Sequence, residues 1–204
     1  MKNHINKLLF IFILFFSLSN FAQCENEINV DCTCPHKQPG VYYKDINGLF
    51  TPFEGEYIYS NNGIIFEIKL LKKLASMPPN NAFCEDMLIG GFRFEDGSQS
   101  VNCIPNINVN YANGRNNNIH ATYFYTGKTR GCDECGDNEK WLIGTIKDPV
   151  SGSVDELYIR KIMHNGQEAI RIFIRHSLGF RLATDPIPPP ITYPVNQYFI
   201  LIKQ

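Results

Sequence analysis

The stretch DELYIRKIMHNGQEAIRIFIR, Asp155 to Arg175, contains two alternating apolar runs joined by Asn165-Gly166. An Asn-Gly pair between two such runs favours a two-residue type I′ turn, and such a turn fixes every cross-strand partner. The aliphatic pairs on one face are then Ile159 with Ile172 and Leu157 with Ile174. The sequence therefore predicts an antiparallel hairpin that buries one aliphatic face.

The opposite face of this hairpin carries aromatic and charged side chains. Tyr158 pairs with Phe173 there, and Arg160 lies directly opposite Arg171. Like charges at opposed positions destabilise a sheet, so we expect a compensating anion. That anion is either a carboxylate on the adjoining strand or an anionic group of a ligand or glycan. We predict that these four residues form a ligand-binding surface.

The rest of the chain contains short β-rich runs separated by Gly, Asn, Asp and Pro, with almost no helix signal. Asn62-Gly63 predicts a second two-residue hairpin, and Asp96-Gly97 a third. The second turn pairs Tyr59 with Phe66, Tyr57 with Ile68 and Glu56 with Lys69. The predicted strands cover residues 54–61, 64–73, 83–94, 98–104, 118–126, 139–147, 154–163, 168–176 and 196–203.

About eight to nine antiparallel strands joined by short turns predict an all-β fold, an up-and-down meander that closes into a barrel. Closure removes exposed sheet edges. The last strand would pair back near the first one, after a Pro-rich crossing at 185–194 that cannot join a ladder. A two-sheet sandwich is the alternative.

The N-terminus is typical of a secretory signal peptide: MKNHINK is followed by the apolar run LLFIFILFFSL and then SNFAQ. The run is shorter than the roughly 20 residues that a membrane span needs. We therefore predict a signal peptide over 1–22, a Cys-rich lead over 23–45 and a β-barrel domain over 46–204. The mature protein would be secreted to the periplasm or the extracellular space. The alternative is a lipoprotein anchored through Cys24, which would leave six of the seven cysteines for disulfides.

Charge argues against nucleic acid as a partner. Without Lys2 and Lys7, the nineteen basic residues fall to seventeen against twenty acidic ones, a formal charge of −3. Binding to a phosphate backbone normally needs a strongly basic face. With 44% apolar residues, the chain is expected to fold as one domain.

The segment LFTPFEGEYIYSNNGIIFEIKLLKK, with Gly55-Glu56-Tyr57 at its start, resembles the opening of lipocalin-like small barrels. Together with CEDMLIGGFRFEDG from Cys84 and the closing YPVNQYFILIKQ, it is similar to a family of small secreted bacterial proteins that is itself a domain of unknown function. The resemblance covers most of residues 40–204. It implies an exported, β-rich, lipocalin-like barrel and no catalytic residue.

The cysteines are expected to form disulfides, because an exported chain meets an oxidising compartment. The candidates are Cys32, Cys34, Cys132 and Cys135. These four with His36 could instead form a zinc site, although we predict no metal. A redox role for Cys132-Asp133-Glu134-Cys135 is disfavoured, because the two carboxylates would raise the pKa of a thiol. Cys84 and Cys103 should lie too far apart to bond, since the third hairpin would place Cys103 opposite Gly90.

No catalytic motif is evident, and we predict a non-enzymatic protein without a cofactor. The acidic residues Glu54, Glu56, Glu85, Asp86 and Glu95 could suggest glycoside hydrolysis, but at strand ends such residues are usually solvated. The leading hypothesis is a barrel that binds a small hydrophobic or anionic ligand in its interior. The alternative is a cell-envelope interaction or structural module whose barrel is filled with its own side chains.

Overall fold

The structure is a computed structural model, and it describes Cys24 and residues 26–31, 36–78, 82–128, 132, 134–176 and 189–204. Within these residues it contains eleven strands and three short 3-10 helices. The strands are β1 (Asn26–Asn29), β2 (Val41–Lys44), β3 (Gly55–Asn61), β4 (Ile64–Ser76), β5 (Cys84–Glu95), β6 (Ser100–Asn102), β7 (Ile119–Thr126), β8 (Lys140–Lys147), β9 (Val154–His164), β10 (Gln167–Arg175) and β11 (Tyr198–Lys203). The 3-10 helices are η1 (Thr51–Phe53), η2 (Ile104–Asn106) and η3 (Gly114–Asn116). The predicted signal peptide, 1–22, lies outside the described residues.

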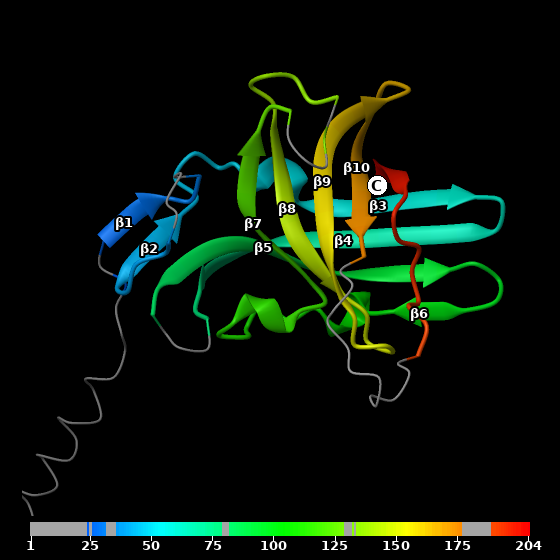
Figure 1. Cartoon of the computed structure of the whole chain (residues 1–204), viewed down its shortest axis with the longest axis horizontal. Coiled ribbons are helices and arrows are strands. Elements are labelled where there is room, and N and C mark those ends of the chain that lie inside the picture. Colours follow the sequence, from blue (N-terminus) through cyan, green and yellow to red (C-terminus); the bar gives the residue numbers. More distant parts are fainter. Residues whose placement is uncertain are drawn as a thin grey trace, which may run out of the picture.

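Eight antiparallel strands close into a barrel, which confirms the predicted fold class. Neighbours follow the order β5-β4-β3-β11-β10-β9-β8-β7, and β5 also pairs with β7. In Figure 1, β3 and β4 run across the molecule while β7 to β10 run steeply, so two layers of strands cross each other. The layers join at two corners, between β5 and β7 and between β3 and β11. As predicted, the last strand pairs with the first strand of the barrel.

Both Asn-Gly hairpins have the predicted register. Asn62 and Asn165 have positive φ angles of 49° and 50°, as a type I′ turn requires at its first central residue. Ile172 lies opposite Ile159, and Phe173 lies opposite Tyr158. In the Asn62-Gly63 hairpin, Tyr57 likewise lies opposite Ile68, and Tyr59 lies opposite Phe66. Local turn chemistry therefore fixed which side chains enter the core.

The predicted register of the third hairpin is wrong by two residues. The loop has four residues rather than two, because Glu95 pairs with Ser100. The Asp96 carboxylate accepts hydrogen bonds from the backbone N–H of Ser98 at 2.9 Å and of Gln99 at 3.0 Å, and this capping stabilises the longer loop. Cys103 consequently lies opposite Phe92 instead of Gly90, and its N–H donates to the carbonyl oxygen of Phe92 at 2.8 Å.

The interior of the barrel is filled with the protein's own side chains. Aliphatic residues of β9 and β10 meet the inward rings of Phe66, Phe92 and Phe199. Phe66 and Phe199 lie with ring centroids 5.4 Å apart in an edge-to-face arrangement, which is a favoured aromatic geometry. Tyr57 and Phe50 are 1% and 0% exposed in the same core. These side chains pack into one core between the two layers of strands.

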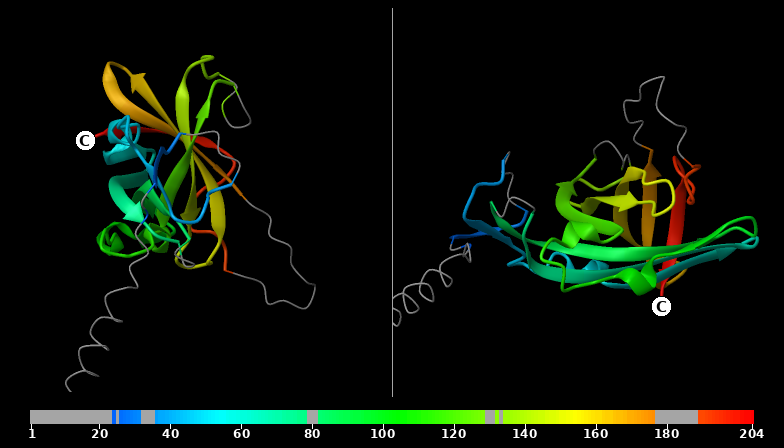
Figure 2. Two further views of the ribbon diagram at one scale, coloured as in Figure 1. Left: turned by 90° about the vertical axis from the view of Figure 1, so that its left-hand side faces the viewer. Right: turned by 90° about the horizontal axis from the view of Figure 1, so that it is seen from below.

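The Cys-rich lead contributes two strands that the sequence did not predict. β1 pairs with β2, and β2 pairs with β5, both in parallel rather than antiparallel orientation. Figure 2 shows this extension beside the barrel. Each of the two strands has four residues, which is too short for a clear alternating pattern.

Buried carboxylates hold the lead against β5. Glu85, with a side-chain exposure of 0%, forms ion pairs with Lys37 and Arg115. Asp86 accepts hydrogen bonds from the Tyr42 hydroxyl at 2.6 Å and from the backbone N–H of Asp45 at 3.0 Å. The expectation that Glu85 and Asp86 are solvated was therefore wrong: both are buried, and the lead supplies Lys37, Tyr42 and Asp45 among their partners.

Candidate functional site

A row of aromatic side chains crosses five neighbouring strands on the outer wall. Its members, one from each strand from β7 to β11, are Tyr125, Trp141, Tyr158, Phe173 and Tyr198. Successive ring centroids lie 5.3, 5.6, 6.0 and 4.8 Å apart. These distances lie within the range of favourable aromatic contacts. We call these five residues the aromatic row.

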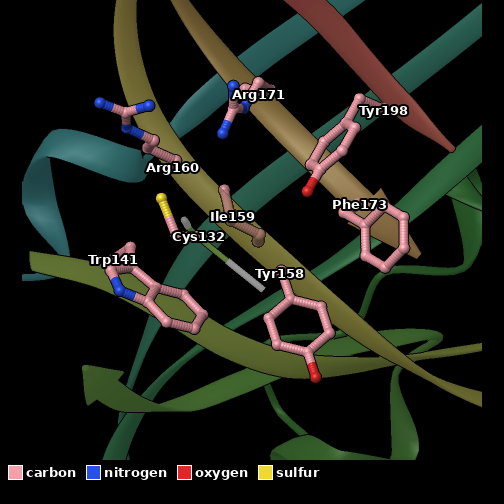
Figure 3. Close-up of a pocket in the computed structure, with 8 residues that line it drawn as sticks. All are labelled: Cys132, Trp141, Tyr158, Ile159, Arg160, Arg171, Phe173 and Tyr198. Carbon is pink, nitrogen blue, oxygen red and sulfur yellow. The ribbon is translucent and has the colours of Figure 1, made fainter. Parts of the chain in front are cut away.

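The four predicted ligand-binding residues lie together in one hollow on this wall. Tyr158, Phe173, Arg160 and Arg171 line it. The other lining residues are Cys132, Trp141, Ile159 and Tyr198. Figure 3 shows the two arginines together at one side of the hollow, with the four rings around the remainder. We call this hollow the arginine pocket; its volume is about 10 Å³, room for about one water molecule.

Two carboxylates compensate the opposed arginines. Glu139, immediately before β8, accepts hydrogen bonds from Nε of Arg160 and, at 2.8 Å, from its Nη2. Glu134 Oε2 lies 2.6 Å from Nη1 of Arg171 and 3.7 Å from Nη1 of Arg160. The predicted compensating anion is thus supplied from within the chain, partly by the residue before the adjoining strand and partly by the C-x-x-C loop.

The two carboxylates differ in how firmly they are held. The side chain of Glu139 is 27% exposed, whereas that of Glu134 is 70% exposed. Hydrogen bonds from Arg160 lower the pKa of Glu139 and the same contact raises the pKa of Arg160. Glu139 is therefore a fixed partner of Arg160, while Glu134 is a solvated carboxylate above both guanidinium groups.

The C-x-x-C loop is closed on itself by a disulfide between Cys132 and Cys135. Both cysteines are buried and pack with Trp141 and Tyr158. The indole N–H of Trp141 donates to the carbonyl of Gly127 at 3.2 Å, so the loop and β8 form one unit. The disulfide prediction is confirmed for these two cysteines, and their sulfurs cannot also be zinc thiolates.

The other two disulfide candidates, Cys32 and Cys34, lie outside the described residues. The lead is instead joined to the barrel by a disulfide between Cys24 and Cys84, which the sequence did not predict. Cys84 and Cys103 are not bonded to each other, as expected, and Cys103 is a buried free thiol. A sulfur in a disulfide cannot also carry a thioether-linked lipid, so the Cys24–Cys84 bond and lipidation of Cys24 exclude each other.

A second, larger hollow adjoins the arginine pocket. It has a volume of about 460 Å³ and is lined by Ile58, Tyr59, Ser60, Asn61, His164, Tyr198, Phe199, Ile200 and Ile202. Tyr198 lines both hollows, and the guanidinium of Arg171 lies 4.8 Å from the centre of its ring. We call this second hollow the corner groove, because it lies where β3 and β11 meet.

Sequence reasoning missed several residues of this surface, including Trp141, Tyr198, Glu134 and Glu139. Outward positions in the predicted strands 139–147 and 196–203 could have indicated the two aromatics, since side chains alternate along a strand. The positions of the two glutamates follow from the folded loop, and no local pattern indicates them. Among the described residues, no group of three or more His, Cys, Asp or Glu side chains is arranged to hold a metal ion.

A family model described as a family of unknown function, DUF6705, matches residues 1–204. The chain belongs to this family. The predicted resemblance to a domain of unknown function is thereby confirmed. No curated protein and no solved structure matches the DUF6705 chain. In the described part of the chain, no helix is long and apolar enough to cross a membrane.

Proposed function

We propose that this DUF6705 protein is an exported, non-enzymatic binding module that uses the outer wall of a filled barrel. Its ligand is a small, partly apolar molecule with a carboxylate or similar anionic group. The anionic group binds Arg171 and Arg160, and the apolar body lies on the rings of Phe173 and Tyr198. Two disulfides support export, because such bonds persist in oxidising compartments.

The observation that carries this proposal is the position of Glu134. An exposed carboxylate of the chain itself already lies at the two guanidinium groups, and this contact supports a carboxylate as the anionic group of the ligand. Arginine forms strong, oriented hydrogen bonds to carboxylates. Because the pocket has room for about one water molecule, a ligand carboxylate has to take the place of Glu134. Because Glu134 is exposed, displacing it from the arginines costs little free energy.

The filled interior favours the outer wall over an interior ligand, the first hypothesis from the sequence. Inward side chains such as Phe66, Phe92 and Leu201 are 0% exposed. In this respect the structure supports the alternative hypothesis, an interaction module with a packed barrel. We retain the ligand chemistry predicted from the sequence and propose that the binding site lies on the outer wall instead of the barrel interior.

Tryptophan fluorescence offers a direct test, because Trp141 is the single tryptophan of the chain and lines the pocket. We expect 3-phenylpropionate to produce a saturable change in Trp141 emission, and the neutral 3-phenylpropanamide to produce none. Glu134→Gln should tighten binding of the acid about threefold to tenfold, because the internal competitor is removed. Arg171→Gln should abolish saturation. Arg93→Gln is the matched control, since Arg93 pairs with Glu95 on β5 and does not line the pocket.

An equal response to the acid and the amide would contradict the proposal. So would unchanged binding in Arg171→Gln with the fold intact by circular dichroism. A linear, non-saturating change in all variants would show that the pocket does not bind this class of ligand.

A further inference from the structure

Among the described residues, the corner between β3 and β11 leaves strand edges without a pairing strand. The β3–β11 ladder contains only two pairs, Ile202 with Ile58 and Lys203 with Tyr57. On its other side β11 pairs with β10 over five residues, from Ile202 to Tyr198. Figures 1 and 2 show β11, in red, beside β10 and crossing the direction of β3. Beyond Ile202, β11 therefore diverges from β3 while it stays attached to β10.

The ladder also fixes where the unpaired backbone groups point. In an antiparallel pair, the N–H and C=O of one residue point to the same neighbour, and successive residues alternate between the two neighbours. Gln204 donates its N–H to the carbonyl of Glu56 at 2.9 Å, so even-numbered residues of β11 point toward β3. Ile200 and Tyr198 thus direct their backbone groups into the corner. Ser60 of β3 does the same, since the odd-numbered residues of β3 pair with β4 in the Asn62-Gly63 hairpin.

Those backbone groups border the corner groove. Its volume of about 460 Å³ lies within the range of known ligand sites. The rings of Tyr59 and Phe199, with centroids 5.2 Å apart, pack against each other between the two diverging strands. On the outer side, Ile58 and Ile202 are directly paired and only partly buried. The groove thus combines apolar side chains with two residues of β11 that offer N–H and C=O groups.

One end of the corner groove has a positive charge that is complementary to an anion. Among the residues that line it, none is acidic and one is a histidine, His164. Arg171 stacks on Tyr198 at the end shared with the arginine pocket. A partner would therefore place apolar side chains along β11 and an acidic group beyond Tyr198.

We propose that the corner groove binds an extended polypeptide segment, which adds as a strand to the open edge of β11. The segment carries apolar residues at alternate positions, because side chains of a strand alternate between its two faces. A carboxylate of the segment, from a side chain or the chain end, reaches Arg171. This inference rests on the proposed function for the carboxylate only; the strand pairing depends on β11 alone.

The test uses the oxidised full-length mature protein and a displayed library of random twelve-residue peptides. Selected peptides are then synthesised and titrated against Ile200→Pro and its matched control Ile200→Val. Proline removes the N–H that points into the corner, and the β10–β11 ladder does not use that N–H; proline is tolerated at such edge positions. Circular dichroism and the melting temperature verify that both variants fold.

We expect enriched peptides with alternating apolar residues that bind Ile200→Pro about tenfold more weakly than Ile200→Val, the effect of losing one hydrogen bond. Methylation of those peptide nitrogens that face β11 should reduce affinity similarly, and methylation of the alternate nitrogens should not. Absence of enrichment, or equal binding to both variants, overturns the inference. A dimer in sedimentation velocity that Ile200→Pro abolishes would overturn it in favour of a second copy of the chain as occupant.

The carboxylate is tested separately with Arg171→Gln. Weaker binding of acidic peptides, with no change for their amidated forms, supports both proposals. Equal binding of acidic and amidated peptides, together with a large effect of Ile200→Pro, overturns the proposed anion site and leaves the strand addition supported.

Discussion

Arg160 and Arg171 lie directly opposite each other on β9 and β10, and the chain compensates them unequally. Arg160 has a fixed partner in Glu139, whereas Arg171 contacts the exposed Glu134. An opposed pair of like charges is unfavourable by itself. Its cost is reduced here by two acidic residues from the segment that precedes β8.

This asymmetry predicts different effects of the two carboxylates on stability. Glu139→Gln should lower the free energy of unfolding by about 1–2 kcal/mol, because it weakens charge-assisted hydrogen bonds to a partly buried arginine. Glu134→Gln should change it by less than about 0.5 kcal/mol, since exposed ion pairs contribute little. Urea denaturation at pH 7 measures both. A larger effect from Glu134→Gln would show that the loop carboxylate is the principal compensating charge.

His120 predicts a pH dependence. Burial, followed by the charge of Arg115, lowers the pKa of His120 to about 4, and its ring lies 3.0 Å from the Thr145 hydroxyl. The unfolded chain takes up a proton near pH 6.5 while the folded chain does not. The contribution to stability is therefore lost progressively as the pH falls from about 6.5 to about 4, by about 3 kcal/mol at most.

The measurement compares the free energy of unfolding of the wild type and of His120→Gln at several pH values between 7 and 4. The difference between the two proteins should shift in favour of the variant as the pH falls. A constant difference would show that His120 has an ordinary pKa. Carboxylates that titrate in this range are common to both proteins and cancel.

The two disulfides should contribute unequally to stability. Cys24–Cys84 joins residues 60 apart, whereas Cys132–Cys135 joins residues 3 apart. If disulfides act mainly by restricting the unfolded chain, removal of the first should cost about 4 kcal/mol and removal of the second about 2 kcal/mol. The variants Cys24→Ser/Cys84→Ser and Cys132→Ser/Cys135→Ser are compared by urea denaturation. A reversed order would mean that contacts of the C-x-x-C loop outweigh chain entropy.

Cys103 should be unreactive until the protein unfolds. It is 2% exposed, and burial with the nearby charge of Asp148 raises its pKa to about 11. The thiolate is the reactive form, so iodoacetamide at pH 8 should label Cys103 only in denaturant. Mass spectrometry of tryptic peptides measures this. Rapid labelling of the native protein would contradict the buried position.

The same mass measurement addresses the N-terminus. An intact Cys24–Cys84 peptide pair under non-reducing conditions is expected. A lipid mass on Cys24 would show that the sulfur is used for anchoring instead.

The local sequence determined much of this fold. Two Asn-Gly turns fixed the registers of the β3–β4 and β9–β10 hairpins, because each turn sets the pairing of the residues around it. The register also placed Arg160 opposite Arg171 and Tyr158 opposite Phe173, before any tertiary information. The register predicted from Asp96-Gly97 was wrong because the Asp96 carboxylate stabilises a longer loop. The dipeptide by itself does not distinguish a two-residue loop from this longer one.

Only the tertiary structure decided what surrounds these residues. Trp141 and Tyr198 are 57 residues apart in sequence and reach one pocket because β8 to β11 are neighbours in the closed sheet. Glu134 contacts Arg171 because it lies in the C-x-x-C loop. The position of that loop depends on the packing of its disulfide against Trp141 and Tyr158. The open edge of β11 likewise arises from the crossing of two layers at a corner. The sequence by itself determined the pairings between residues that are near in the chain, since turns act locally. Closure of the barrel determined the arginine pocket and the corner groove, since it joins strands that no local pattern connects.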